Sequence, residues 1–239
     1  MPSDDAESLT IQLEDGRTVS GLLHIPRQVV ACLALAHGAG AGMTHPFLSA
    51  LAAGLAERRI ATLRYQFPFM ERGSRRPDPP ALAQATVRTV LVLARRLVPR
   101  IPLFAGGKSF GGRMTSQAQA ESPLSGVRGL VFLGFPLHPP GRPSDERGRH
   151  LFDVQVPMLF LQGARDDFAS LLLLRPLIER LGARATLELI ADADHSFHVP
   201  ARTGRSNEEV FTGMLERLVA WMETVGGCTE PRGFQGAGK

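Results

Sequence analysis

The sequence predicts an α/β fold: a mostly parallel sheet of about seven or eight strands, helices on both faces, and an antiparallel hairpin at the start. Three observations predict it. Short apolar runs alternate along the chain with longer stretches of helical spacing. Strands that alternate with helices form parallel sheets with right-handed crossovers. The pair Asp15-Gly16 joins two strand-like segments near the N-terminus, which is typical of a hairpin.

The expected strands and helices can be placed in order from the N-terminus. The run ACLALAH, residues 31–37, is apolar and ends at glycines, which is typical of a strand buried on both faces. We expect strands at 8–13, 18–25, 31–37, 60–66, 101–105, 129–135, 156–161 and 185–190. Helical spacing predicts helices over 46–58, 81–97, 109–121, 168–181 and 207–224.

The connections between these elements are short. The segments 67–80 and 136–149 are rich in Pro, Gly and Arg, and we expect loops there that are too short to form a large lid. We predict one domain over residues 1–225 and a flexible tail over 226–239, because the tail has little apolar surface to order it. Active groups are expected at the carboxyl ends of the parallel strands, in an open site.

Composition narrows the class of protein. The chain has 239 residues, of which 44% are hydrophobic and 21% charged, as in an ordinary globular protein. The formal charge is +4, but the basic residues are dispersed, so we expect no nucleic-acid partner. The apolar runs are too short to cross a bilayer, and the polar N-terminus lacks a secretory pattern, so we expect a cytoplasmic protein without a membrane partner. Cys32 and Cys228 form neither a disulfide framework nor a zinc motif.

The stretch AGGKSFGGRM, residues 105–114, admits two interpretations. A phosphate-binding loop needs a glycine five residues before Gly107, and that position is Pro102 inside a strand-like run. A second glycine-rich stretch, HGAGAGMTH, resembles a dinucleotide motif, but Met43 replaces its third glycine. Both cofactor sites are therefore weakly supported, and we expect no cofactor.

The alternative interpretation is a nucleophile turn, Gly-x-Ser-x-Gly, centred on Ser109. Such a turn lies between a strand and a helix, and its serine adopts a strained backbone that requires small neighbours. Gly107 and Gly111 occupy the two required positions, and Gly112 adds clearance below the helix. A plain helix-capping serine after a glycine turn would give the same letters.

A catalytic serine needs a base, and the base needs a carboxylate that orients it. The strand VPMLFLQG is followed by ARDDF, which places Asp166 or Asp167 just beyond a strand end. The strand ATLELI is followed by ADADHSFH, which offers His195 or His198. The spacing favours Asp166 and His195, and the chain order serine, acid, histidine fits this architecture.

Alternatives within these stretches remain open at this point. Asp167 could replace Asp166 as the acid, and His198 could replace His195 as the base. A metal cluster is also conceivable, although we expect no metal; its ligands would be Asp192, Asp194, His195 and His198. The remaining histidines that we interpret as ordinary surface or loop residues are His24, His138 and His150.

An oxyanion hole needs two backbone N–H donors. The residue after the serine, Phe110, would supply one. The glycine-rich turn after residues 31–37 would supply the other, with Ala39 preferred and Gly40 second. A plain strand-to-helix turn is the alternative for this segment.

These blocks resemble the α/β-hydrolase superfamily. GGKSFGGRM, LQGARDDF and ADADHSFHVP are similar to the motifs of small bacterial dienelactone-hydrolase-like proteins, a group related to the testis-expressed and NSL-complex hydrolase-like proteins. The resemblance extends to about residue 225 and implies an α/β-hydrolase fold with Ser109, Asp166 and His195 as catalytic triad.

Two functions are compatible with this resemblance. The first is a serine hydrolase that cleaves an ester, lactone or thioester of a small molecule through an acyl-enzyme. The second is an interaction or scaffolding protein that retains the fold with little turnover. For the enzyme, the candidate substrate-binding residues are Lys108, beside the serine, and three aromatic residues in or near the expected loops, Phe67, Phe69 and Phe135.

Overall fold

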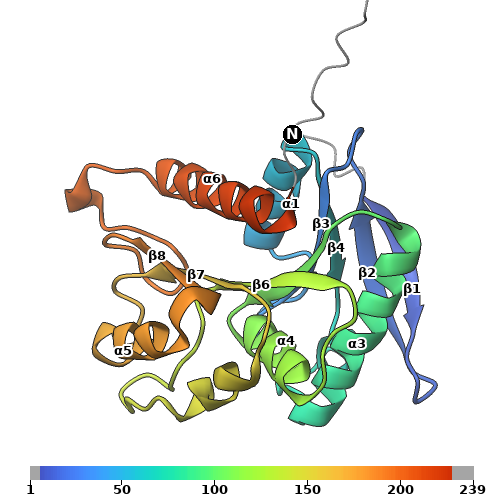
Figure 1. The fold of residues 1–239 in the computed structure, drawn as a ribbon, viewed down its shortest axis with the longest axis horizontal. Coiled ribbons are helices and arrows are strands. Elements are labelled where there is room, and N and C mark those ends of the chain that lie inside the picture. Colours follow the sequence, from blue (N-terminus) through green and yellow to red (C-terminus); the bar gives the residue numbers. More distant parts are fainter. Residues whose placement is uncertain (1–5, 228–239) are drawn as a thin grey trace, which may run out of the picture.

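The computed structural model describes residues 6–227, which form one eight-stranded sheet with helices around it (Figure 1). The spatial order of the strands is β1-β2-β4-β3-β5-β6-β7-β8. β1 and β2 are antiparallel, β2 is antiparallel to β4, and all other neighbours are parallel. The strands are β1 (Glu7–Gln12), β2 (Thr18–His24), β3 (Ala31–Ala36), β4 (Ile60–Tyr65), β5 (Leu103–Lys108), β6 (Val127–Leu133), β7 (Met158–Gly163) and β8 (Ala185–Ile190).

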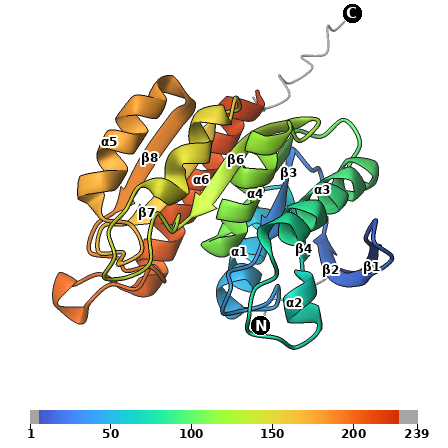
Figure 2. The ribbon, with the colours of Figure 1, turned by 90° about the horizontal axis from the view of Figure 1, so that it is seen from below.

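Helices cover both faces of the sheet (Figure 2). α1 and α6 pack together on one face, whereas α3, α4 and α5 lie on the other. The α-helices are α1 (Pro46–Glu57), α2 (Pro68–Glu71), α3 (Pro80–Leu97), α4 (Phe110–Glu121), α5 (Leu171–Leu181) and α6 (Asn207–Gly226). Three 3₁₀ segments complete the described chain: η1 (Glu146–Asp153), η2 (Gly182–Arg184) and η3 (Ala201–Thr203).

The core is divided between the two faces by the alternation of side chains along each strand. In β3, Leu33 and Leu35 join the core under α1 and α6, whereas Ala34 and Ala36 face the core under α3 and α4. Every residue of β3 is buried, because helices cover the strand on both sides. The predicted architecture, a mostly parallel α/β sheet with an N-terminal antiparallel hairpin and no large lid, is confirmed.

Local sequence signals fix several element ends. Gly16 adopts a positive φ of 84° in the turn between β1 and β2. Ser206 caps α6 through a capping box, in which its side chain accepts from Glu209 N and the Glu209 side chain accepts from Ser206 N.

Within residues 6–227, no helix is both long enough and apolar enough to span a membrane.

The structure corrects the prediction that residues 67–80 and 136–149 are only loops. The first contains the short helix α2, held by Asp78, whose carboxylate accepts from Phe69 N at 2.6 Å and from Arg72 at 2.7 Å. The second leads into η1, which begins at Glu146 and packs against α4 and α5. Tertiary contacts order both segments. The Pro- and Gly-rich composition gave no sign of these short helices in the sequence.

Several boundaries also differ from the predictions. β6 spans Val127–Leu133 in place of 129–135, and α5 begins at Leu171 in place of 168. β5 extends to Lys108, so Gly106 and Gly107 are strand residues and not part of a turn. At the other end, α6 continues to Gly226, and Gly227 caps it with a φ of 67°. The rest of the predicted tail, residues 228–239 with Cys228, lies outside the described residues.

Close contact between β5 and β3 explains the glycines around residue 109. A Cβ on Gly107 would lie 2.2 Å from the carbonyl oxygen of Ala36. A Cβ on Gly111 would lie 2.6 Å from the carbonyl oxygen of His37. Both contacts are with backbone atoms, which cannot move aside without disturbing the sheet.

We therefore expect Gly107→Ala to lower the free energy of unfolding by about 3 kcal/mol, since the added methyl overlaps the backbone of β3. Urea denaturation followed by circular dichroism measures the change. Gly213→Ala is the matched control. Gly213 lies inside α6 with no atom within 4 Å of an added Cβ, so alanine should stabilise the protein by about 1 kcal/mol or less. Equal effects of the two substitutions would contradict the packing argument.

Candidate active site

Ser109 lies at the sharp turn between β5 and α4, near the middle of the sheet. Its φ of 50° and ψ of −114° place it in a region that non-glycine residues rarely adopt. Its own N–H donates to the carbonyl of Leu133 at 3.1 Å. The strained backbone directs the side chain away from the helix axis, and Ser109 lines a cleft in place of capping α4. The helix-capping interpretation is wrong, since Ser109 makes no side-chain capping bond.

His195 and Asp166 complete a hydrogen-bonded chain with this serine. His195 Nε2 lies 3.0 Å from Ser109 Oγ, and His195 Nδ1 lies 2.7 Å from Asp166 Oδ2. His195 follows β8 and Asp166 follows β7, so both lie at carboxyl ends of parallel strands, as the sequence predicted. The Asp166 side chain is fully buried, whereas 21% of the His195 side chain is exposed.

The Asp166 carboxylate is held in place by further donors. Its Oδ1 accepts from Phe168 N at 2.8 Å. Its Oδ2 also accepts from Gln162 Nε2 at 2.5 Å, and Gln162 Oε1 in turn accepts from Phe135 N at 2.8 Å. Gln162 is a fully buried positioning residue that sequence reasoning missed, because it reads as the polar end of an apolar strand. Asp167 is exposed.

The other polar residues near His195 stabilise its turn. Asp194 Oδ1 accepts from Ser196 N at 2.8 Å and from His198 N at 3.0 Å. His198 is exposed at the edge of the cleft. Among the residues that the structure describes, no three His, Cys, Asp or Glu side chains gather in a way that could hold a metal ion. Asp194 therefore serves the turn and not a metal cluster.

The turn between β3 and α1 faces Ser109 across the cleft and contains Ala39 and Gly40. His37, fully buried at the start of this turn, is a second residue that sequence reasoning missed. Its Nδ1 donates to the carbonyl of Gly38 at 2.7 Å, and its Nε2 accepts from Phe67 N at 2.9 Å. Burial lowers the pKa of His37 to about 4, so the ring is neutral at pH 7 and supports one donor and one acceptor.

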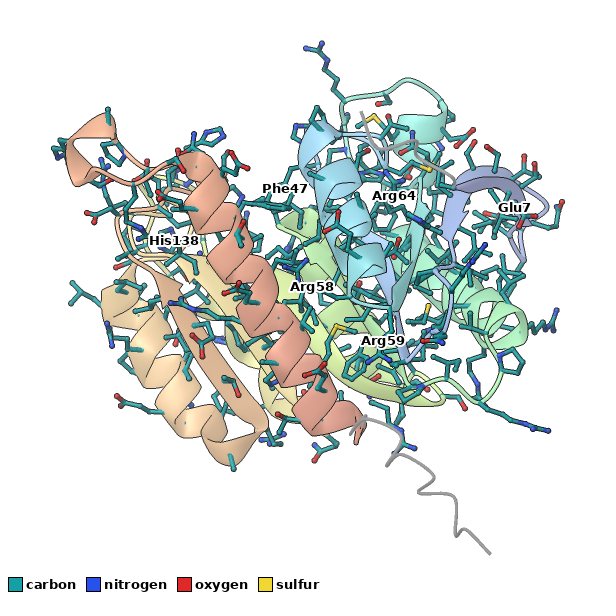
Figure 3. All side chains as sticks on the ribbon, turned by 90° about the horizontal axis from the view of Figure 1, so that it is seen from above. Glu7, Phe47, Arg58, Arg59, Arg64 and His138 are labelled. Carbon is teal, nitrogen blue, oxygen red and sulfur yellow. The ribbon has the colours of Figure 1, made fainter. Side chains whose placement is uncertain are left out.

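A buried arginine holds the C-terminal part of the turn between β3 and α1. Arg64, on β4, donates from Nη1 to Ser49 Oγ at 2.7 Å and to the carbonyl of Met43 at 3.3 Å (Figure 3). Met43 N donates to Gln66 Oε1 at 2.9 Å. These bonds attach the glycine-rich segment to the sheet at both ends, although it contains three glycines.

The cleft above Ser109 has a volume of about 720 Å³. Phe47 projects from the start of α1 toward α6, where it stacks on Phe197 at 5.7 Å and meets Phe211 edge-on at 5.9 Å (Figure 3). Phe168 packs at 4.4 Å from the His195 ring. The cleft is therefore walled by four aromatic rings, with the serine at its base.

This arrangement corrects the predicted aromatic wall. Phe67, Phe69 and Phe135 are buried in the core under α3 and α4, with at most 1% of each exposed, and none lines the cleft. The sequence could not show this, since residues 67–69 leave β4 on the face opposite to the cleft. The signal for the true wall lies in the aromatic residues at the ends of α1 and α6, Phe47 and Phe211.

The interpretation of the other histidines is also corrected in part. His138 lies in a loop as predicted, but only 3% of it is exposed (Figure 3). Its Nε2 accepts from Ser170 N at 2.8 Å. His150 Nε2 contacts Ser116 Oγ at 2.8 Å, and burial lowers the pKa of His150 to about 4. His24 is half-buried on β2.

Lys108 lines the cleft next to Ser109, but its ammonium is engaged within the protein. Nζ donates to the carbonyl of His195 at 2.6 Å and lies 5.3 Å from the centre of the Phe197 ring. Burial lowers the pKa of Lys108 to about 8, although the carboxylates of Asp166 and Asp194 act in the opposite direction.

The geometry above places the chain among proteins with a nucleophile turn, an acid and a histidine on a mostly parallel sheet. The family model described as alpha/beta hydrolase domain matches residues 29–223. The chain therefore belongs to the alpha/beta hydrolase domain family, and the predicted superfamily resemblance is confirmed.

Solved structures of low sequence identity share the fold. A lidless a/b serine hydrolase from Xanthomonas campestris is 22% identical and superposes with a TM-score of 0.70 over 92% of this chain and 96% of its own. Dienelactone hydrolase from Anabaena variabilis is 20% identical, with a TM-score of 0.76 over 92% of this chain and 98% of its own. A cold-adapted esterase from an Arctic intertidal metagenomic library is 20% identical, with a TM-score of 0.63 over 90% of this chain and 92% of its own.

Proposed function

We propose that this protein is a serine hydrolase that cleaves an ester, lactone or thioester of a small molecule through an acyl-enzyme on Ser109. The observation that carries the proposal is the hydrogen-bonded chain from Ser109 Oγ through His195 to Asp166, at 3.0 and 2.7 Å. A serine that served only the fold would need neither the strained φ of 50° nor a histidine aligned on its hydroxyl.

The hydrogen bonds assign the proton positions. The Asp166 carboxylate accepts from Nδ1–H of His195, so Nε2 is the free nitrogen that faces Ser109 Oγ. His195 takes the hydroxyl proton while Ser109 Oγ attacks the substrate carbonyl, and then gives that proton to the leaving alcohol or thiol. A water molecule that loses its proton to His195 next attacks the acyl-enzyme. The bond between the acyl carbon and Ser109 Oγ then breaks, His195 returns the proton to Oγ, and the acid is released.

Two backbone donors are proposed for the oxyanion. Phe110 is the first residue of α4, and its N–H has no partner within the helix. The carbonyl of Gly38 is bonded to the His37 ring, and in a trans peptide the next N–H, that of Ala39, points the opposite way. A Cβ on Gly38 would lie 3.8 Å from Ser109 Cβ, so this peptide adjoins the nucleophile. These facts support Ala39 over Gly40.

The substrate class follows from the cleft and from the relatives. The aromatic walls favour an apolar group beside the scissile bond. The similar structures named as dienelactone hydrolase and esterase support ester or lactone chemistry, although fold alone does not fix activity. The chain's own residues supply the nucleophile, base, acid and oxyanion donors, so the mechanism requires no cofactor. The scaffolding alternative has the same fold and would differ only in lacking turnover.

A fluorophosphonate probe tests the proposal directly. We expect the probe to attach to Ser109 at a stoichiometry near one, because the aligned imidazole activates that hydroxyl. Mass spectrometry of the labelled peptide identifies the site, and Ser109→Ala should abolish labelling. Labelling of another serine, or none in the folded protein, would favour the scaffolding alternative.

The two adjacent aspartates provide a matched pair. We expect Asp166→Asn to lower kcat for a p-nitrophenyl ester by roughly 10⁴-fold, because the asparagine stabilises the wrong tautomer of His195. Asp167→Asn removes an equal charge from an exposed position and should change kcat by less than about tenfold. The reverse order would move the acid to Asp167.

The aromatic wall gives a prediction about binding. We expect Phe47→Ala to raise KM for a p-nitrophenyl ester about three- to tenfold with kcat nearly unchanged, since the lost apolar contact stabilises substrate and transition state alike. Phe152→Ala is the control, since Phe152 is also half-buried but packs against Arg180 outside the cleft. A similar rise in KM in both variants would show that the ring acts through stability alone.

A further inference from the structure

Lys108 has an environment that the proposed triad does not explain. A buried ammonium is costly unless it has partners, and the pKa of this one is lowered to about 8. Among the residues described, it is also the sole lysine, since the other lysine of the chain is Lys239. A functional reason for a cation at this position should therefore be visible in its contacts.

The contacts join two segments that are far apart in the sequence. Lys108 ends β5 and directly precedes Ser109, whereas its Nζ donates to the carbonyl of His195 at 2.6 Å. The same ammonium lies over the Phe197 ring at 5.3 Å. One side chain thus connects the strand that carries the nucleophile with the turn that carries the base.

A glycine makes room for this connection. Gly134, which follows β6 between the two segments, has a φ of 70°. A Cβ at Gly134 would lie 2.9 Å from Lys108 Nζ and 3.3 Å from His195 Nδ1. The ammonium and the imidazole therefore lie against the same glycine, and any larger residue would push one of them out of place.

The turn that carries His195 is held from outside at both ends and in its middle. Arg165 N donates to the carbonyl of Ala193 at 2.8 Å, and Val199 N donates to Asn207 Oδ1 at 3.0 Å. Between these ends, Phe197 adopts a φ of 65°, which a bulky residue accepts only when surrounding contacts impose it. The ammonium of Lys108 holds this middle part, because it contacts the carbonyl of His195, two residues earlier, and the ring of Phe197 itself.

We propose that Lys108 is a positioning residue, whose ammonium fastens the His195 turn to the nucleophile strand and holds a positive charge beside the imidazole. The proposal rests on the hydrolase function proposed above. The charged groups that face this ammonium are the carboxylates of Asp166 and Asp194, and both favour its charged form. The proposal replaces the earlier expectation that Lys108 binds the substrate, because Nζ already donates to the carbonyl of His195.

Kinetics of Lys108→Met test the proposal, since methionine has a similar length and shape without donor or charge. We expect kcat for a p-nitrophenyl ester to fall about tenfold or more with KM within about twofold, because a displaced base affects the chemical step and not binding.

Three comparisons separate the donor and its charge from general damage. Lys108→Arg keeps both the donor and the charge and should keep most of kcat. Lys108→Cys in a Cys228→Ser background, converted to S-aminoethylcysteine, restores an ammonium of nearly the same reach and should recover most of kcat. Arg202→Gln removes an equal charge from an exposed site on η3 and should leave kcat and KM in place.

Hydrogen exchange provides a measurement that needs no turnover. In Lys108→Met the amides of Phe197 and His198 should exchange about tenfold faster or more than in wild type, because the middle of the turn has lost its anchor. Unchanged exchange, or a rise in KM with kcat intact, would overturn the proposal. Activity in Ser109→Ala would instead overturn the hydrolase function, and the exchange measurement would still decide the role of Lys108.

Discussion

The lack of space between β5 and β3 is the constraint on which the site depends. Gly107 and Gly111 bring the chain so close to Ala36 and His37 that any side chain would overlap the backbone. This contact forces the turn to be sharp, and the sharp turn gives Ser109 its positive φ. Ser109 is thus fixed by a densely packed part of the sheet, where displacement is costly.

The rest of the site consists of groups that are oriented by buried hydrogen bonds. Asp166 receives bonds from Gln162, Phe168 and His195, which satisfy its carboxylate without water. His37, on the opposite side of the cleft, orients a peptide through a neutral ring. In both places a polar side chain inside the core determines the direction of a group at the surface of the cleft.

Sequence patterns predicted the parts of the molecule that depend on local chemistry. Alternating apolar runs and helical spacing located the eight strands and five long helices, and the glycines around Ser109 indicated the strained turn. Tertiary partners were not predictable. Gln162 bonds to Asp166, 4 positions away, and His37 bonds to Phe67, 30 positions away. Lys108 bonds to His195, 87 positions away. The aromatic wall was misassigned for the same reason. Which face of the sheet Phe67 and Phe47 occupy depends on how the chain leaves each strand, and short motifs do not encode it.

The three residues of the site sit at different distances from the edge of the sheet. Ser109 follows β5, which has strands on both sides, whereas His195 follows β8, the last strand, whose residues are mostly half-buried. Edge strands open more readily than central ones. Mild heat or denaturant should therefore detach His195 while Ser109 is still in place. Activity would then be lost reversibly before the rest of the protein unfolds, and the edge of the sheet, not the core, would limit the working temperature.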